Sequence, residues 1–392
     1  MQIAFDAKRI FQNFTGLGNY SRTLISELAL RLPELEAYLM APKISDYPET
    51  QRFLNNPSFR VISPPPNRKL LWRTRGMVSD LKKLKPKLYH GLSNELPLGI
   101  QRSGIPSVVT IHDLIFKHFP QQYGRWDRTI YDLKFKYACQ KADRIVAISE
   151  ATKADIVDFY QIDPDHINVI YQACDERFLV SKLSDFRLPQ VEDIPQKRDI
   201  PKSTRGEENG IYKTLQLPKT YSLYLGSIIE RKNLMSIIEA LALLPKDLKH
   251  PLVIVGRGQD YKKRCIERAQ KLKVDHLLLF RQVDNEQLPA VYRGARCFLY
   301  PSLAEGFGIP VIEALNSGTP VITSNISSLP EAAGPDSLLV NPTLPEAIAD
   351  AWAKLLQDDV LHTRVAQAGL KYAERFRADV VVPQMIELYN AI

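Results

Sequence analysis

The feature that most constrains the fold is an alternation of short β-rich runs with longer helical patterns along nearly the whole chain. This rhythm is typical of a parallel sheet covered by helices on both faces. It occurs twice, because a charged, proline-containing stretch separates a first set from a second. A length of 392 residues also suits two domains better than one core. We therefore expect an α/β chain with two Rossmann-like lobes, at 1–178 and 211–375, joined by a linker at 179–210.

The candidate strands are apolar runs bounded by turn residues. In the first set they are Gln2–Asp6, Glu36–Ala41, Phe59–Ser63, Lys87–His90, Ser107–His112, Arg144–Ser149 and Ile167–Tyr171. In the second set they are Tyr221–Leu225, Leu252–Val255, Leu277–Phe280, Cys297–Tyr300 and Pro320–Thr323. Open parallel sheets bind ligands at the carboxyl ends of their strands. Polar motifs directly after these strands are therefore the candidates for function.

Charge and cysteine content narrow the classes of function. The four cysteines lie far apart and form no Cys-x-x-Cys pair, which argues against a zinc cluster or a secreted disulfide framework. No run approaches the roughly 18 apolar residues of a transmembrane helix. We expect a cytoplasmic protein without a resident metal, and any membrane contact to be peripheral. The net charge of +8 suits a phosphorylated small molecule, an anionic membrane or nucleic acid.

The densest motif is the segment Pro301–Leu315, which follows a candidate strand and opens a helix. Gly306 and Gly308 allow the backbone to approach a ligand closely, and the helix start attracts phosphate or sugar hydroxyls. Glu305 and Glu313 supply acceptors for the hydroxyls of a sugar or ribose. The alternative is a loop whose glycines only make a turn and whose glutamates are solvated.

A second motif follows the strand that ends at Leu225. It contains Gly226 and the adjacent cations Arg231 and Lys232, and it also leads into a helix. Such cations at the end of a sheet would balance a diphosphate and, if the diphosphate is a leaving group, stabilise the charge that develops in the transition state. The alternative is an ordinary basic loop.

The remaining signals are weaker. Gly16 and Gly18 precede the first long helix, where their amides would approach a substrate or simply form a turn. His112 ends an apolar strand, where a structural role or a hydrogen bond to a sugar is more common than acid–base work. Arg68–Lys87 is basic and amphipathic, so it would rest on an anionic membrane or pack its apolar face on the sheet. The Val255–Gly258 turn ends another strand and would line a nucleotide pocket, although glycine is commonplace after a strand.

Together these motifs resemble the retaining GT-B glycosyltransferases, specifically glycosyltransferase family 4. The resemblance spans nearly the whole chain and rests on Asp6, Gly16–Tyr20, Thr110–Asp113, Ala147–Glu150, Gly226, Arg231–Leu234 and Glu305–Glu313. The last is the family's signature of a Glu, seven residues and a second Glu. The resemblance implies a GT-B fold with a central cleft, a nucleotide-sugar donor held by the second lobe and an acceptor held by the first. It also implies that the last helix, 376–392, returns to the first lobe.

The resemblance implies roles for individual residues as well. The implied catalytic residues are His112, Arg231, Lys232 and Glu305. The implied donor-binding residues are Gly16, Gly18, Gly226, Arg231, Lys232, Glu305, Gly306, Phe307, Gly308 and Glu313. In this scheme the cations hold the diphosphate, Glu313 holds the ribose, and Glu305 with the neighbouring amides holds the sugar. No cofactor or divalent metal is implied.

Within the family the motifs are most similar to bacterial mannosyltransferases that use GDP-mannose to build surface polysaccharides. A UDP-sugar donor, such as UDP-glucose, is the main alternative. The implied acceptor is a saccharide or a lipid-linked saccharide, with no nucleic acid partner and with peripheral contact to the inner face of the membrane as an open question. Two other classes are less favoured: a glycoside hydrolase that uses Glu305 and Glu313, and a basic membrane- or nucleic-acid-binding protein.

Overall fold

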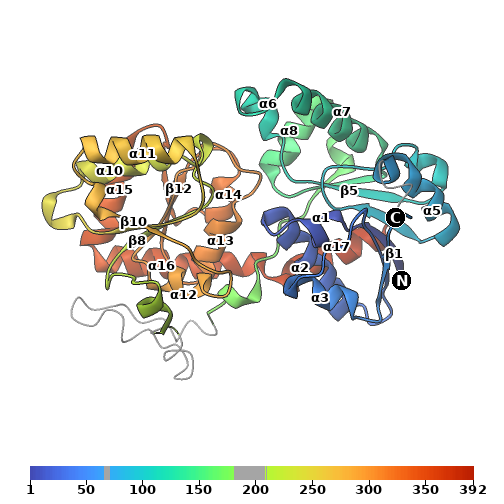
Figure 1. The fold of residues 1–392 in the computed structure, drawn as a ribbon, viewed down its shortest axis with the longest axis horizontal. Coiled ribbons are helices and arrows are strands. Elements are labelled where there is room, and N and C mark those ends of the chain that lie inside the picture. The colour runs from blue at the N-terminus through green and yellow to red at the C-terminus, as the bar shows by residue number, and fades with distance from the viewer. Residues whose placement is uncertain (66–70, 181–207, 209) are drawn as a thin grey trace. The chain divides into compact units, whose positions relative to one another are not determined.

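In a computed structural model, which describes residues 1–65, 71–180, 208 and 210–392, the chain divides into two compact units. The first unit comprises Met1–Ala173 and Ala378–Ile392, and the second comprises Cys174–Arg377. Most of the expected linker at 179–210 lies outside the described residues. Each unit is a parallel sheet with helices between its strands, so the predicted α/β architecture is confirmed (Figure 1).

The first unit is built on a seven-stranded sheet in the order β3-β2-β1-β4-β5-β6-β7. Its strands are β1 (Gln2–Asp6), β2 (Glu36–Met40), β3 (Phe59–Ile62), β4 (Leu88–Gly91), β5 (Ser107–Ile111), β6 (Arg144–Ala147) and β7 (Ile167–Val169). Alternate residues of β1 face opposite cores: Ile3 and Phe5 belong to one hydrophobic cluster and Ala4 to another. Because both faces are covered, the strands are apolar throughout rather than alternating.

The helices of the first unit connect its strands. They are α1 (Lys8–Gln12), α2 (Gly16–Arg31), α3 (Pro48–Leu54), the π-helical turn η2 (Trp72–Gly76), α5 (Met77–Leu84), α6 (Ile115–His118), α7 (Arg125–Lys141), α8 (Glu150–Tyr160) and α17 (Ala378–Asn390). The Ser149 hydroxyl caps α8 by accepting from the Thr152 amide, as expected for an N-cap.

The C-terminal helix α17 lies in the first unit although it is the last element of the chain (Figure 1). Its Val382 and Met385 are buried in the same core as β1. The hydroxyl of Tyr389 lies 2.6 Å from Nδ1 of His90 on β4. These contacts fix the end of the chain against the first sheet.

The described part of the basic segment Arg68–Lys87 packs its apolar side chains against the first sheet. Trp72, Met77 and Leu81 are buried in the core on one side of the first sheet. The indole Nε1 of Trp72 donates to Asp80 at 2.6 Å. Because the tryptophan is buried, it is not available to anchor the segment in a membrane.

The second unit has a six-stranded sheet in the order β10-β9-β8-β11-β12-β13. Its strands are β8 (Ser222–Leu225), β9 (Leu252–Val255), β10 (Leu278–Arg281), β11 (Phe298–Tyr300), β12 (Val321–Ser324) and β13 (Leu338–Val340). Its helices are the 3₁₀ turn η8 (Glu230–Lys232), α10 (Leu234–Leu243), α11 (Asp260–Lys271), α12 (Leu288–Gly294), α13 (Ile309–Asn316), α14 (Leu329–Ala333), α15 (Pro345–Gln357) and α16 (Asp359–Ala373). Only the short edge strand β13 was missed by the sequence.

Candidate active site

The predicted second-unit motifs meet at one point of its sheet. Strands β8 and β11 are neighbours, but from β8 the order continues outward through β9 and β10, and from β11 through β12 and β13. Such a reversal is the topological switch point at which open α/β sheets bind ligands. The loop with Gly226, Arg231 and Lys232 follows β8, and the loop with Glu305 to Gly308 follows β11.

At this switch point the two predicted cations bind the same predicted carboxylate. Lys232 Nζ lies 2.5 Å from Oε1 of Glu305, and Arg231 Nη1 lies 3.2 Å from Oε2. The three side chains are only 10–14% exposed. Burial alone would raise the pKa of Glu305, but Lys232 and Arg231 outweigh it and hold the pKa below its usual value. The cluster therefore contains an ionised carboxylate and an excess of one positive charge.

Residues that the sequence analysis did not single out hold the cations in place. Lys232 Nζ donates to the hydroxyl of Tyr300, the last residue of β11, and lies 4.8 Å from the centre of its ring. The Ser302 hydroxyl donates to Glu305 Oε1 at 2.6 Å, and it also lies 3.0 Å from the carbonyl of Arg231. These contacts join the loops after β8 and β11, which are about 70 residues apart in sequence. Pairings at such separation leave no periodic signal in the sequence.

The loop after β11 is also supported by the next strand in the sheet. The hydroxyls of Ser327 and Ser328, which follow β12, donate to the carbonyl of Glu305 at 2.9 and 2.8 Å. The Ser328 hydroxyl lies equally close, at 2.8 Å, to the carbonyl oxygen of Phe307, so the two carbonyls share its proton. The side chain of Phe307 is buried 5.4 Å from the ring of Phe376. The loop is thus fixed in its described conformation rather than being a loose turn.

Glycines allow the post-strand loops to pack against one another. Gly226 has a φ of +147° and Gly256 a φ of +159°, which other residues rarely adopt. A Cβ at Gly256 would lie 1.9 Å from the carbonyl oxygen of Gly226. Gly308, with a φ of +129°, occupies the N-cap of α13. The Gly256 loop, which the sequence analysis regarded as commonplace, is therefore necessary for the close approach of the loops after β8 and β9.

Glu313 lies on α13 and is not part of the ion cluster. The hydroxyl of Tyr292 donates to its Oε2 at 2.9 Å. Burial raises the pKa of Glu313 to about 8, and the nearby Asp175 acts in the same direction, although Tyr292 and Arg177 oppose the rise. The two glutamates of the predicted pair therefore differ in charge at neutral pH: Glu305 is ionised and Glu313 is mostly protonated.

The predicted residues of the first unit have clear structural partners. His112 is buried, with Nε2 2.9 Å from the carbonyl of Leu92 and Nδ1 3.0 Å from Nε2 of Gln172. Burial lowers the pKa of His112 to about 4, so the ring is neutral at neutral pH. Both ring nitrogens are thus engaged, and a sugar hydroxyl would have to displace one partner.

Gly16 and Gly18 lie in the first turn of α2, so they begin this helix rather than precede it. The Oδ1 of Asn13 accepts from the amides of Thr15 and Gly18, both at 3.0 Å, and this supports the start of the helix. A Cβ at Gly18 would lie 1.8 Å from the carbonyl oxygen of Asn13, whereas a Cβ at Gly16 would meet nothing within 4 Å. Gly18 is therefore required by packing, and Gly16 is not.

The described residues contain no group of three or more His, Cys, Asp or Glu side chains placed to hold a metal ion. Within the same residues, no helix has both the length and the apolar character needed to cross a membrane.

Two Rossmann-like units, with a basic post-strand loop and a supported Glu-containing loop in the second, define the GT-B glycosyltransferase class. The family model of glycosyl transferases group 1 matches residues 212–372, and that of Glycosyltransferase Family 4 matches residues 14–178. These two ranges cover most of the chain, and the chain belongs to glycosyltransferase family 4. It is therefore a glycosyltransferase, as its motifs indicated.

Individual relatives agree with this family. The chain is 28% identical to the O-antigen chain mannosyltransferase B of Escherichia coli, and the alignment covers 100% of both proteins. Among solved structures it is similar to Anabaena HepE in complex with UDP and glucose, with a TM-score of 0.72, 16% identity and 100% coverage of both chains. It is also similar to WaaG, a glycosyltransferase involved in lipopolysaccharide biosynthesis, with a TM-score of 0.71, 18% identity and 99% coverage of both chains. The two structural likenesses concern the fold alone.

Proposed function

We propose that the protein is a retaining hexosyltransferase that moves mannose from GDP-mannose to a saccharide or lipid-linked acceptor in surface polysaccharide synthesis. The observation that carries this proposal is the cluster of Arg231, Lys232 and Glu305 at the switch point of the second sheet. The full-length similarity to an O-antigen mannosyltransferase favours mannose as the transferred sugar. A UDP-sugar is the alternative donor, and the UDP and glucose held by HepE support it.

The ion cluster suits the release of a nucleoside diphosphate. Arg231 and Lys232 share one carboxylate, so one positive charge remains to stabilise the diphosphate as its negative charge grows. Glu305, held ionised by these cations, would accept hydroxyls of the transferred sugar with the amides of Gly306, Phe307 and Gly308 beside it. Glu313 would accept the ribose hydroxyls, and His112 would contact the sugar. Gly16 or Gly18 would lie near the phosphates, and Gly226 would leave room for the donor.

In the proposed reaction the acceptor oxygen attacks the anomeric carbon from the face that the diphosphate leaves. The departing phosphate oxygen takes the acceptor's proton, so the configuration is retained and no enzymatic nucleophile is needed. We further propose that the reaction needs no divalent metal, because the two cations supply the charge that a metal would provide. A glycoside hydrolase would instead use its two carboxylates on a substrate without phosphate, and it would have no use for Arg231 and Lys232.

The decisive experiment is a thermal-shift screen of GDP, UDP, ADP and their sugars in the presence of EDTA. We expect stabilisation by GDP and GDP-mannose, and its loss in Arg231→Ala and Glu313→Ala. The matched control is Arg268→Ala, because Arg268 on α11 forms its ion pair with Glu239 on α10, and neither residue belongs to the cluster or to the turn that carries it. If UDP stabilises the protein instead, the donor is a UDP-sugar and the proposed donor site still stands. No response to any nucleotide would refute the proposal.

We also propose that the protein acts in the cytoplasm, in peripheral contact with the inner face of a membrane where a lipid-linked acceptor would be held, and without a nucleic acid partner. The support is the exposure of large apolar side chains, of which Trp126 on α7 is 83% exposed. Binding to anionic vesicles that is weakened by Trp126→Ala would agree with this proposal. If the wild-type protein does not sediment together with the vesicles, the proposal is contradicted.

A further inference from the structure

His112, which follows β5, is held in place through both its backbone and its ring. Its amide donates to Oδ1 of Asn94 at 2.7 Å. The ring of Tyr20 meets the imidazole edge-on, with the two ring centres 4.8 Å apart and the planes at 86°. Because the side chain of His112 is also buried, its ring occupies one well-defined position.

The two ring contacts of His112 select one tautomer. Nε2 lies 2.9 Å from the carbonyl oxygen of Leu92, and a carbonyl can only accept, so Nε2 must carry the hydrogen. Because the ring is neutral at neutral pH, Nδ1 then has a lone pair. The side-chain Nε2 of Gln172 lies 3.0 Å from Nδ1, and its N–H donates to that lone pair. The opposite tautomer would leave both Leu92 and this amide without a matching partner.

Gln172 is placed for this contact by the strand that precedes it. It lies in the segment after β7, where the amide of Ile170 donates to the carbonyl of Ala147 on β6 at 3.0 Å. The side chain of Gln172 is buried and therefore shielded from competing water. It is 60 residues from His112 in sequence, so no local motif joins the two.

We propose that Gln172 is a positioning residue for sugar transfer, which holds His112 in the tautomer that offers an N–H at Nε2 to an oxygen of the sugar. This proposal rests on the proposed function, in which His112 contacts the transferred sugar. A sugar oxygen would take this hydrogen in place of the carbonyl of Leu92. Since Gln172 occupies the lone pair of Nδ1, His112 orients the sugar and does not act as a general base.

A neutral ring suits this place because the sugar becomes positively charged as the diphosphate leaves. An imidazolium would oppose that charge. The amide of Gln172 binds only the neutral form of His112 and so disfavours protonation. The titratable groups that face the ring from other elements are Arg9 on α1, His90 on β4 and Tyr20 on α2. Arg9 also opposes protonation, and burial keeps His90 and Tyr20 uncharged by lowering the pKa of the first and raising that of the second.

The first test reads the ring nitrogens of His112 by NMR in the full chain labelled with ¹⁵N-histidine. The loss of its signals in His112→Ala identifies them. We expect an unprotonated Nδ1 and a protonated Nε2 between pH 6 and 8. Gln172→Met keeps the size of the side chain but removes the donor, so it should shift the Nδ1 signal. A proton on Nδ1 of the wild type, or an unchanged Nδ1 signal in Gln172→Met, would overturn the proposal.

Two controls show whether Gln172→Met acts only at His112. The ring signals of His90, which is buried between Tyr389 and Thr110, should stay unchanged and thereby report that the first sheet remains folded. Gln140→Met is the matched control, because Gln140 is exposed on α7. It should leave the signals of both histidines as in the wild type.

The second test measures hydrolysis of GDP-mannose, or of UDP-glucose if UDP stabilises the protein, with water in place of the acceptor. Gln172→Met should lower kcat about 10- to 100-fold and change KM less than about twofold, because the orientation of a bound group is lost rather than binding itself. In the His112→Ala background the same substitution should have no further effect, since Gln172 acts through His112. A loss of equal size in that background would show a merely structural role and overturn the proposal.

The two tests separate this proposal from the proposed function. The ring measurement needs no nucleotide, so if it gives the expected signals while no nucleotide stabilises the protein, the proposed function fails and the tautomer of His112 stands. If the donor is hydrolysed but Gln172→Met works at the wild-type rate, the proposed function stands and the positioning role of Gln172 is overturned.

Discussion

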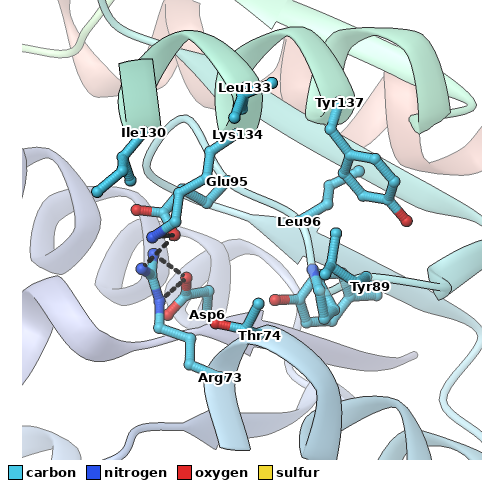
Figure 2. Close-up of a pocket in the computed structure, with 12 residues that line it drawn as sticks. Asp6, Arg73, Thr74, Tyr89, Glu95, Leu96, Ile130, Leu133, Lys134 and Tyr137 are labelled. Atoms are coloured by element: carbon cyan, nitrogen blue, oxygen red, sulfur yellow. Dashed lines mark hydrogen bonds and ion pairs between the residues drawn. The ribbon is translucent and has the colours of Figure 1, made fainter. Parts of the chain in front are cut away.

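The two switch points of this molecule occupy equivalent positions in their sheets but carry different sets of charged groups. In the first unit, where the strand order reverses between β1 and β4, two carboxylates, Asp6 and Glu95, hold Arg73 and Lys134 (Figure 2), and Lys8 also interacts electrostatically with this group. In the second unit, Glu305 alone holds both Arg231 and Lys232, so that one positive charge remains. The same strand topology thus provides a place for a ligand twice, and the post-strand residues decide which ligand each place can take.

The two switch points also differ in the residues that surround the charged groups. A first pocket, of about 270 Å³, lies at the switch point of the first unit and is closed on one side by apolar residues of α7, whereas the second site is built from close-packed glycine and serine loops. Apolar and aromatic surface suits the C–H face of a sugar, and a cationic loop with close backbone suits a diphosphate. The comparison therefore predicts that variants at the two points affect different substrates.

The largest effect is expected from removing one cation at the second switch point. Lys232→Ala should lower kcat/KM for the donor by about 10²–10³-fold, because a group that stabilises developing charge is lost. Lys134→Ala is the matched change at the first switch point, and it should leave the affinity for nucleoside diphosphate unchanged. Steady-state kinetics with a calorimetric measurement of GDP binding would compare them. Equal losses of GDP affinity in the two variants would break the comparison.

The next effect concerns the stability of the loop before α2 in the first unit. Gly18→Ala should reduce the free energy of unfolding by about 1–3 kcal/mol, because the new Cβ would overlap the carbonyl of Asn13. Gly16→Ala should change it by less than about 0.5 kcal/mol, since that Cβ meets nothing within 4 Å. Denaturant unfolding of the two variants provides the measurement. An equal destabilisation would show that the packing at Gly18 is not the cause.

Much of this arrangement follows from local sequence, and the rest depends on distant pairs. Apolar runs predicted the strands that end at Asp6 and Tyr300, and the spacing of Glu305 and Glu313 placed both beside a helix start. The pairing of Asp6 with Arg73 joins residues 67 positions apart, and nothing in the local pattern indicates it. The same holds for the hydrogen bond between Tyr292 and Glu313.

The first pocket was missed for a further reason. Its wall is formed by α7, whose apolar residues Trp126, Ile130 and Leu133 are exposed while Phe135 is buried. Because apolar side chains occur on both faces, the helix lacks the single apolar stripe by which amphipathic helices are recognised. Glu95 lies in the loop after β4, where no glycine motif marks it. The sequence therefore indicated the donor-binding loops and left this pocket unmarked.

The pH dependence of nucleotide binding should distinguish Glu313 from the ion cluster. Tyr292 already donates to this carboxyl, so accepting two ribose hydroxyls as well requires the ionised form. Burial raises the pKa of Glu313 to about 8, so in the free protein the proton must be released below that pH. The affinity for GDP should therefore rise by up to about tenfold per pH unit from pH 6.5 towards 8 and then level off.

Glu313→Gln is the control for that measurement, because it keeps the shape of the side chain but cannot titrate. The phosphates of GDP also titrate near pH 6, and the variant retains their contribution. Calorimetric titrations of both proteins across this range would isolate the effect of Glu313. If the wild type and Glu313→Gln show the same slope, the carboxyl does not bind the ribose in its ionised form.

The smallest effect expected is the response of GDP binding to salt, and it tests the excess positive charge at the second switch point directly. Raising the ionic strength from 50 to 500 mM shortens the Debye length from about 14 to about 4 Å, so attraction between an anion and the second switch point should weaken. Because Arg231 and Lys232 are only 14% and 13% exposed, screening acts on them incompletely, and we expect the Kd of GDP to rise about threefold. The Lys232→Ala variant, whose cluster has no excess positive charge, should show a smaller rise. Titrations of GDP against both proteins at both salt concentrations make the measurement, and an equal rise in the two Kd values would show that the excess charge of the cluster is not the cause.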